Sequence, residues 1–328
     1  LGDVYKRQGE IDPNDTENFM VCDNYIDTAV ELGLYDPDSG KPFIWREVYG
    51  NIKAPRTSVS GAWTRLWRVY STLSPSQKWN LFEAPDYPFS IKPEKPVSVQ
   101  DVLALFRDEQ IGTFLDMSED RDWYIPYRDT WVKSPLANPQ GLPWWDDLVG
   151  INYYRPIARY YNSYWFIGQA RDWLPNDIGG VIWFGLDNPA NSPAIPVYIG
   201  INDVPESWKT LDRTKLDRNS AWWAFGLVDD LVNWMYGILK PKLNEVLMPF
   251  QEKLFQMQPA VEKAALQLYE VDPELAREFL TSYTSGKMLE AEKLYWELVD
   301  RFLFQLNNNS PLRKAYSDFL REQATKEE

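Results

Sequence analysis

The chain has 328 residues, of which 44% are hydrophobic and 25% charged, so it is long enough for one large core or two ordinary ones. A formal charge of −14 and the lack of a Lys/Arg cluster argue against a nucleic-acid partner, because phosphate binding needs a basic surface. No apolar run reaches the roughly 18 residues of a membrane-spanning helix, so no membrane segment is predicted.

The first eight residues, LGDVYKRQ, show no periodicity that predicts an element and do not start with Met. Asp3 to Gln8 resemble the translation of a transposon end that is used to fragment DNA for sequencing libraries. We therefore expect residues 1–8 to be a library scar and exclude them from the prediction of the fold.

The segment 17–34 is predicted to be an amphipathic helix, with Phe19, Ile26 and Val30 on its apolar side and Gly33 at its end. Residues 36–40, DPDSG, are typical of a turn; a calcium-binding loop would need a later bidentate Glu that the spacing lacks. In TRLWRVYSTLSPSQKW, residues 64–79, Arg65 and Arg68 would share one face if the segment is helical.

Ser98 is predicted to cap a helix, because Asp101 stands three residues later and apolar residues follow at helical spacing. That helix should end before Gly112. Residues 119–150 are rich in Pro, Trp and Asp, which predicts a long loop carrying Trp144-Trp145-Asp146-Asp147. The two carboxylates beside tryptophans are compatible with a glycosidase pair, but adjacent residues point apart, which favours a solvated loop.

Residues 163–171 and 180–187 are predicted to be strands joined by a turn at 175–179, and a third strand is expected within 193–201. From 220 to about 307 the pattern is helical. We expect breaks at Pro241, Pro249 and Pro259 and a new start at Asp272-Pro273. The last helix carries one apolar stripe, for which a core contact is favoured over a partner-docking surface: Met288, Ala291, Tyr295, Leu298 and Phe302.

The types of residue limit the possible chemistry. There is no histidine, which excludes a Ser-His-Asp triad, a Cys-His dyad and a His-ligated zinc site from these residues. The single cysteine, Cys22, excludes an internal disulfide and a multi-Cys metal site, and we expect neither metal nor cofactor. The 16 Trp, 19 Tyr and 15 Phe are compatible with a sugar-binding cleft, although core filling is favoured. The compartment and the oligomeric state stay open.

Several blocks of the sequence, in this order, resemble the dipeptidase A and secernin family of cysteine-type dipeptidases. They are APR with TRLWR (54–68), VSVQDV with RD, GT and DM downstream (97–117), RPI (155–157), QAR with WLPNDIGGVIWFGLD (169–187), and SAWWAF (220–225). One block alone is weakly specific, but the ordered set spans nearly all of residues 17–305.

The resemblance implies an α+β fold of the N-terminal-nucleophile (Ntn) hydrolase type, an αββα sandwich of two stacked antiparallel sheets between helices. Residues 9–218 would be the C-terminal part of this peptidase domain, and residues 219–328 a helical region packed on it. The resemblance also leads us to expect short polar residues before the QAR strand. The chain has Ala158-Arg159-Tyr160-Tyr161 there, which bears on substrate preference.

The resemblance also implies the reaction. The family nucleophile is a cysteine at the start of the mature chain, its own α-amine acts as general base, and dipeptides are hydrolysed through an acyl-enzyme. We expect that cysteine to be missing from this fragment and the fragment to be inactive. Cys22 would lie on a helix as a buried structural thiol. Arg65 is the candidate pocket residue, and a structural ion pair is an equally good interpretation of it. For Arg68 and Arg171 the structural ion pair is favoured.

Two other functions are kept open. A carbohydrate-active protein is favoured if Trp144, Trp145 and Asp116 line one open groove. A non-catalytic interaction module could use the C-terminal helices. In either case no nucleic-acid or membrane partner is expected.

Overall fold

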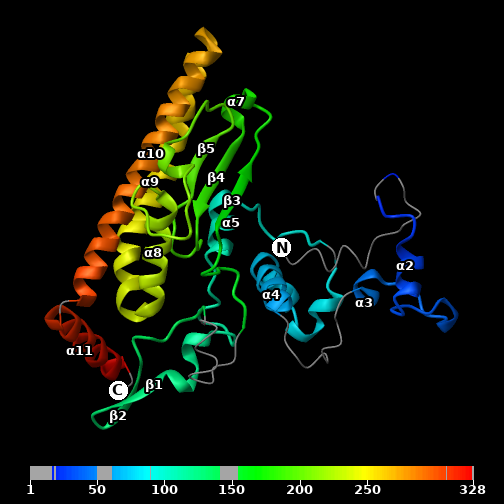
Figure 1. Ribbon diagram of the computed structural model, residues 1–328, viewed down its shortest axis with the longest axis horizontal. Helices are drawn as coiled ribbons and strands as arrows, with labels where there is room; N and C mark the ends of the chain where they lie inside the picture. The colour runs from blue at the N-terminus through cyan, green and yellow to red at the C-terminus, as the bar shows by residue number, and fades with distance from the viewer. Residues whose placement is uncertain are drawn as a thin grey trace. The chain divides into compact units, whose positions relative to one another are not determined.

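The computed structural model describes residues 17, 20–49, 61–88, 90–140, 154–307 and 309–326. The chain divides into two compact units, residues 1–96 and residues 97–328, which are described separately below. Both helices and antiparallel sheets occur, so the predicted α+β class is confirmed (Figure 1).

The described part of the first unit is helical. Its elements are α2 (Tyr25–Glu31), η1 (Pro37–Ser39), α3 (Trp45–Val48), α4 (Gly61–Leu73), η2 (Pro75–Gln77) and η3 (Leu81–Asp86). The longest helix, α4, buries Leu66, Trp67 and Tyr70 on one face. Tyr70 stacks on Tyr87 with ring centroids 5.4 Å apart, which fastens α4 to the segment after η3.

The predicted helix over 17–34 is wrong in length, and Phe19 lies outside the described residues. α2 begins only at Tyr25, after a turn through Asp23 and Asn24, whose short polar side chains favour turns over helix interiors. Its end is as expected. Gly33 has φ +66°, and the Leu34 N–H donates to the Ala29 carbonyl over 2.8 Å, which closes a Schellman motif.

The turn expected at 36–40 is confirmed as η1. The Asp36 side chain accepts a hydrogen bond from the Asp38 N–H, and Gly40 has φ +69°. The three-residue spacing of Arg65 and Arg68 falls within α4, so the two residues share a helix face.

The second unit contains all the strands that the described residues form. Its elements are α5 (Val99–Phe106), η4 (Met117–Glu119), η5 (Arg121–Trp123), β1 (Tyr124–Tyr127), β2 (Thr130–Lys133), β3 (Tyr164–Gln169), α7 (Asn176–Gly179), β4 (Val181–Leu186), β5 (Ile195–Tyr198), η6 (Glu206–Trp208), α8 (Ala221–Trp234), α9 (Tyr236–Val271), α10 (Pro273–Asn307) and α11 (Asn309–Lys326). The cap predicted at Ser98 is confirmed as a capping box with Asp101, and α5 ends before Gly112 as expected.

The long loop predicted over 119–150 is wrong in its first part, because β1 and β2 form an antiparallel hairpin there. Its loop has only two residues, Arg128 and Asp129, between the paired Tyr127 and Thr130. Arg128 takes φ +54°, a conformation usually given to Gly or Asn, so the common sequence signal of a tight hairpin is missing. Residues 144–147 lie outside the described part of the chain.

The three predicted strands are confirmed as one antiparallel sheet in the order β3-β4-β5. The register pairs Phe166 with Phe184 and Gly168 with Ile182. The expected turn between the first two strands is the short helix α7. Gly179 is required at its end, because a Cβ there would lie 2.5 Å from the Arg171 carbonyl oxygen.

The helical prediction for the C-terminal part is correct in type and wrong in its breaks. α9 runs without interruption through Pro241, Pro249 and Pro259. All three prolines lie on its exposed side, while Leu247 and Leu254 on the opposite side are buried, so packing of the apolar face outweighs the lost backbone hydrogen bonds. The actual break is at Met235, between α8 and α9.

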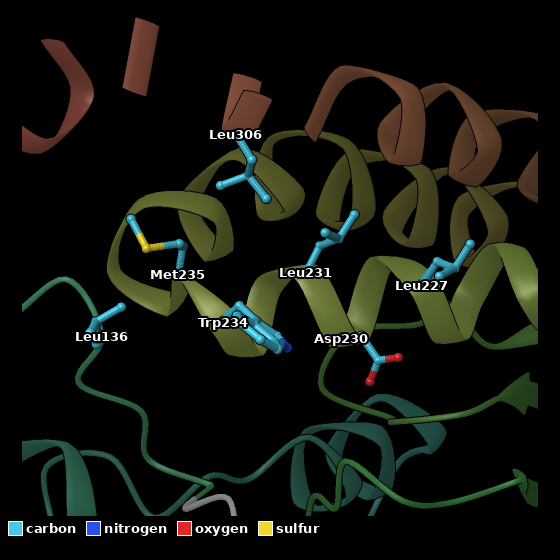
Figure 2. Close-up of a pocket in the computed structure, with 7 residues that line it drawn as sticks. All are labelled: Leu136, Leu227, Asp230, Leu231, Trp234, Met235 and Leu306. Atoms are coloured by element: carbon cyan, nitrogen blue, oxygen red, sulfur yellow. The ribbon is translucent and has the colours of Figure 1, made fainter. Parts of the chain in front are cut away.

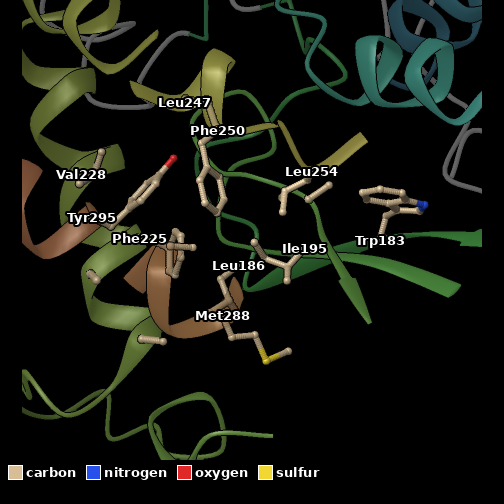
Figure 3. Packing of buried hydrophobic residues seen from close by; sticks show 14 of the residues in the cluster. Trp183, Leu186, Ile195, Phe225, Val228, Leu247, Phe250, Leu254, Met288 and Tyr295 are labelled. Carbon is tan, nitrogen blue, oxygen red and sulfur yellow. The ribbon is translucent and has the colours of Figure 1, made fainter. Parts of the chain in front are cut away.

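One hydrophobic core joins the sheet to the helices, as Figure 3 shows. α10 packs against α8, α9 and β5, and α8 also contacts β4. The predicted stripe from Met288 to Phe302 is buried throughout, so it is a core contact and not a docking surface. Among the described residues, no helix is both long and apolar enough to cross a bilayer.

Candidate functional site

Arg65, the candidate pocket residue from the sequence, lies half-buried on α4 in the first unit. Its Nε donates to the carbonyl of Gly61, one turn earlier, over 3.0 Å. This bond fixes the direction in which the guanidinium leaves the helix. A role of Arg65 in a pocket stays a prediction.

Cys22 is neither helical nor buried, so both expectations for it are wrong. It precedes α2 in an irregular segment, and its side chain is exposed. Because Cys22 is an internal residue, its nitrogen is a peptide amide and cannot act as an amine base.

Asp116 does not line an open groove. It is buried, and its Oδ1 accepts hydrogen bonds from the N–H and the hydroxyl of Ser118 at 3.0 and 2.7 Å. Its other oxygen accepts the Gly112 N–H at 2.9 Å. Asp116 therefore stabilises the turn in which it lies. It is not available as the carboxylate of the carbohydrate-binding groove considered from the sequence.

Arg171 has the structural role that the sequence favours. Its Nη1 lies 2.6 Å from Glu262 Oε2 on α9, and both side chains are largely buried. Its other nitrogens donate to the carbonyls of Gly179 and Ile178. The arginine thus ties the turn after β3 to α9.

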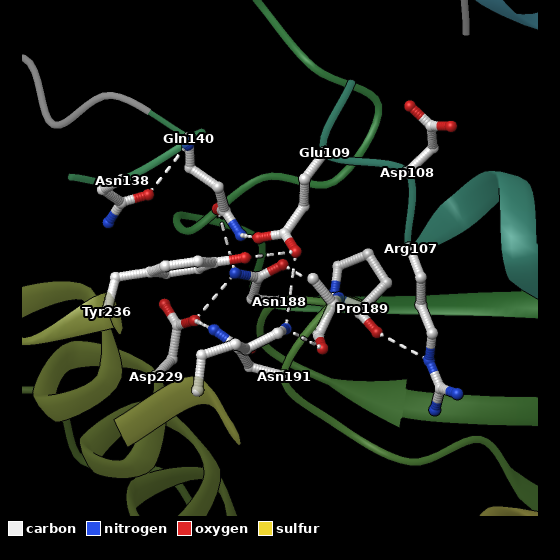
Figure 4. A network of polar contacts seen from close by, with 12 residues as sticks. Arg107, Asp108, Glu109, Asn138, Gln140, Asn188, Pro189, Asn191, Asp229 and Tyr236 are labelled. Atoms are coloured by element: carbon white, nitrogen blue, oxygen red, sulfur yellow. Dashed lines mark hydrogen bonds and ion pairs between the residues drawn. The ribbon is translucent and has the colours of Figure 1, made fainter. Parts of the chain in front are cut away.

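Many of the buried polar side chains that the structure describes surround the segment 187–192, Asp-Asn-Pro-Ala-Asn-Ser. It follows β4 and is called the DNPANS segment below (Figure 4). At one end, Arg107 reaches in from the C-terminus of α5. Its Nε donates to the Pro189 carbonyl at 3.1 Å and its Nη2 to the Ser192 carbonyl at 3.0 Å. Burial lowers the pKa of Arg107 to about 10, so the arginine remains charged at neutral pH.

Lys240 on α9 holds the middle of the DNPANS segment. Its Nζ donates to the Ala190 carbonyl at 2.7 Å and to Asn191 Oδ1 at 2.5 Å, and lies 3.5 Å from Glu109 Oε2. Burial lowers the pKa of Lys240, and the charge of Glu109 opposes that shift. Glu109 is itself fixed by hydrogen bonds of 2.8 Å from Gln140 and from the hydroxyl of Tyr236.

Asp229 on α8 is the acceptor for three amide groups. Its Oδ1 accepts from Asn188 and Asn191, both at 2.7 Å, and its Oδ2 accepts from Asn233 at 2.9 Å. Burial raises the pKa of Asp229 to about 7, although the hydrogen bonds from Asn191 and Asn188 act in the opposite direction.

Asp187 begins the segment with φ +61° and a buried side chain. Burial raises its pKa well above the ordinary value, and the negative charges of Asp229 and Asp230 raise it further. α8 can approach closely because Gly226 faces this carboxylate: a Cβ there would lie 3.0 Å from Asp187 Oδ2. Two buried acids thus share one small region, an arrangement common at functional sites.

This network can hold protons and fix the DNPANS segment, but it contains no cysteine. Among the described residues, no group of three His, Cys, Asp or Glu side chains could bind a metal ion. Glu109, Asp229 and Lys240 are not among the site residues predicted from the sequence. The available signal was a charged residue inside an otherwise apolar helical stretch, as in GLVDDLVNW.

The comparison with known families decides the classification. The family model described as peptidase family C69 matches residues 6–248, which include α4, the sheet, the DNPANS segment and α8. The chain belongs to peptidase family C69. The resemblance stated from the sequence blocks is thereby confirmed.

The curated relatives described here are named as dipeptidases. A probable dipeptidase of Latilactobacillus sakei is 25% identical over 232 residues, which cover 70% of this chain and 42% of the relative. Dipeptidase A of Lactobacillus helveticus is 23% identical and covers 69% of this chain and 41% of the relative. The chain therefore spans about two fifths of the length of the curated relatives it matches.

Proposed function

We propose that the protein acts as a dipeptidase, a peptide hydrolase whose substrates are dipeptides. The main support is the match of the peptidase family C69 model over residues 6–248, together with relatives that are named as dipeptidases. Chain composition supports the thiol-and-amine mechanism that the resemblance implies, because that mechanism needs no histidine and the chain has none.

In the proposed reaction, a cysteine thiolate attacks the peptide carbonyl. The amine of that same cysteine first accepts the thiol proton and then donates a proton to the leaving amine of the second amino acid. Water next hydrolyses the thioester, which returns the free thiol and releases the first amino acid. The nucleophile is a cysteine other than Cys22, because Cys22 carries no free α-amine, and these 328 residues alone are expected to be inactive.

Arg65 is the proposed pocket residue of this reaction. A guanidinium near the nucleophile would stabilise the thiolate or hold the carboxylate of the dipeptide through two parallel hydrogen bonds. Its support is the position of Arg65 in the TRLWR block and its fixed exit from α4.

We also propose the Ntn-type αββα sandwich for the complete fold, with residues 9–218 in the peptidase domain and 219–328 as helices packed on it. The support is the uncovered face of the β3-β4-β5 sheet. Tyr164 and Phe166 on β3 are 60% and 54% exposed, and Ile182 on β4 is 36% exposed. A second sheet stacked on this face would remove these side chains from water.

Hydrolysis of a panel of dipeptides, followed by release of free amino acids, tests the proposal. The full gene product is expected to hydrolyse dipeptides, and its Cys22→Ala variant should keep nearly all of that activity. The 328-residue chain should hydrolyse none. Activity of the 328-residue chain that Cys22→Ala abolishes would refute the assignment of the nucleophile, and a full product inactive on every dipeptide would refute the function.

A further inference from the structure

A hollow of about 580 Å³ lies in the second unit along the outer side of α8 (Figure 2). Most of its wall is aliphatic and comes from Leu136, Leu227, Leu231, Met235 and Leu306. These residues belong to the loop after β2, to α8 and the residue after it, and to the end of α10. The volume is within the range of pockets that bind small molecules.

Two side chains in this hollow are not aliphatic, and both come from α8. Asp230 and Trp234 are four residues apart, so they lie on one side of the helix, as Figure 2 shows. The Trp234 side chain is 64% exposed, which leaves a ring face open to a ligand. A carboxylate next to an accessible indole ring is a typical environment for an organic cation.

The charge of Asp230 has no local compensation. In the described part of the chain, no hydrogen bond or ion pair joins Asp230 to a cation, and the residue is exposed to solvent. Among the residues that line the hollow, Asp230 is the one with an ionisable side chain. Its carboxylate therefore biases the potential of this apolar hollow toward cations.

We propose that this hollow binds a small organic ammonium ion. The apolar body of the ligand fills the space between the leucines, and its charged nitrogen sits between the Asp230 carboxylate and the face of Trp234. This inference does not depend on the proposed peptidase reaction, because binding is measured without turnover.

The test is calorimetric titration of the 328-residue chain at low ionic strength with 2-phenylethylammonium and its neutral analogue 2-phenylethanol. The ammonium ion is expected to bind about tenfold more tightly than the alcohol, since it adds a charge-assisted contact. Asp230→Asn should abolish that difference and leave the affinity for the alcohol unchanged. Trp234→Leu should weaken binding of the ammonium ion about fivefold.

Glu297→Gln provides the matched control. Glu297 is an exposed acid on α10 outside the hollow, so its loss should change neither affinity. Equal affinities for the ammonium ion and the alcohol, or an Asp230→Asn variant that binds both as the parent does, would overturn the proposal. A dimer that hides the hollow and does not dissociate on addition of 2-phenylethylammonium would also overturn it.

Discussion

At the scale of single residues, Asp187 is an acid whose ionisation the fold opposes. Burial and the charges of Asp229 and Asp230 raise its pKa, whereas the Asn188 N–H and the charge of Arg213 act in the opposite direction. At pH values between the pKa of Asp187 in the unfolded chain and its pKa in the folded chain, the folded state binds more protons than the unfolded state. The contribution of Asp187 to stability is therefore fully present below about pH 4 and is lost as pH rises through the raised folded pKa.

Asp187→Asn should remove this dependence. Asn keeps an acceptor for the Asn188 N–H and tolerates φ +61°. We expect the variant to exceed the parent in unfolding free energy at pH 8 and to match it at pH 4. Denaturant unfolding across this pH range is the measurement.

The control for this prediction has the opposite sign. A hydrogen bond from Arg218 lowers the pKa of exposed Asp300, so its small contribution is present at neutral pH and is lost in acid. Asp300→Asn should therefore not stabilise the protein at pH 8. If the unfolding free energies of the parent and Asp187→Asn change with pH in the same way, the role given to Asp187 is contradicted.

Arg65 is the residue on which the proposed pocket can be tested. Arg65→Lys keeps the charge but loses the planar pair of donors, so in the active full-length protein kcat/KM should fall by about 10- to 100-fold, or roughly 1 to 3 kcal/mol. Arg68→Lys, one turn away on the same helix, should leave kcat/KM close to the parent value. An unchanged kcat/KM in Arg65→Lys and Arg65→Ala, with both variants folded, would leave Arg65 with a structural role only.

At the scale of elements, α9 tolerates prolines that would normally end a helix. Pro249 lies in its interior, on the exposed side. Pro249→Ala restores a backbone donor and removes a clash with the preceding turn, although it gives the unfolded chain more freedom. We expect a net gain of about 1 to 2 kcal/mol, measured as a rise in Tm.

Pro273→Ala is the matched control for α9. Pro273 occupies the first position of α10, where proline is favourable because no backbone donor is needed. Its replacement should leave Tm unchanged or lower it slightly. If both substitutions raise Tm equally, the destabilisation caused by a proline does not depend on its position within the helix.

The elements also show what the sequence can and cannot predict. The cap at Ser98 and the three strands depend on neighbouring residues and were predicted correctly. The prolines of α9 were misjudged, because a local rule cannot include the burial of residues such as Leu247. The β1–β2 hairpin was missed since its turn uses Arg128 where glycine or asparagine is usual.

The buried network around the DNPANS segment could not be predicted for a related reason. Glu109, Asn188 and Asp229 come from distant parts of the chain, and only the packing of α5, β4 and α8 brings them together. A charged residue in an apolar stretch indicates that a partner exists, but it does not identify the partner.

At the scale of the whole molecule, the net charge of −14 opposes the compact state. Salt screens this repulsion over about 10 Å at 0.1 M. We therefore expect Tm to rise by a few degrees, on the order of 2 to 4 °C, between 10 and 150 mM NaCl.

Sucrose at matched osmolality is the control for the effect of salt, since a neutral solute does not screen charge. A Tm that is constant or falls with NaCl would mean that exposed ion pairs such as Arg218 with Asp300 outweigh the general repulsion.

The edge of the β3-β4-β5 sheet has a consequence for handling the protein. β3 pairs with β4 alone among the described strands, so within the described part of the chain its other edge has no strand partner, and the exposed Tyr164 and Phe166 lie on this strand. Such an edge is a template for adding a strand from another copy. Addition of this kind is bimolecular, whereas folding of one chain is not. The yield of monomer on refolding should therefore fall as the protein concentration rises, and dilution, more than temperature, should determine recovery.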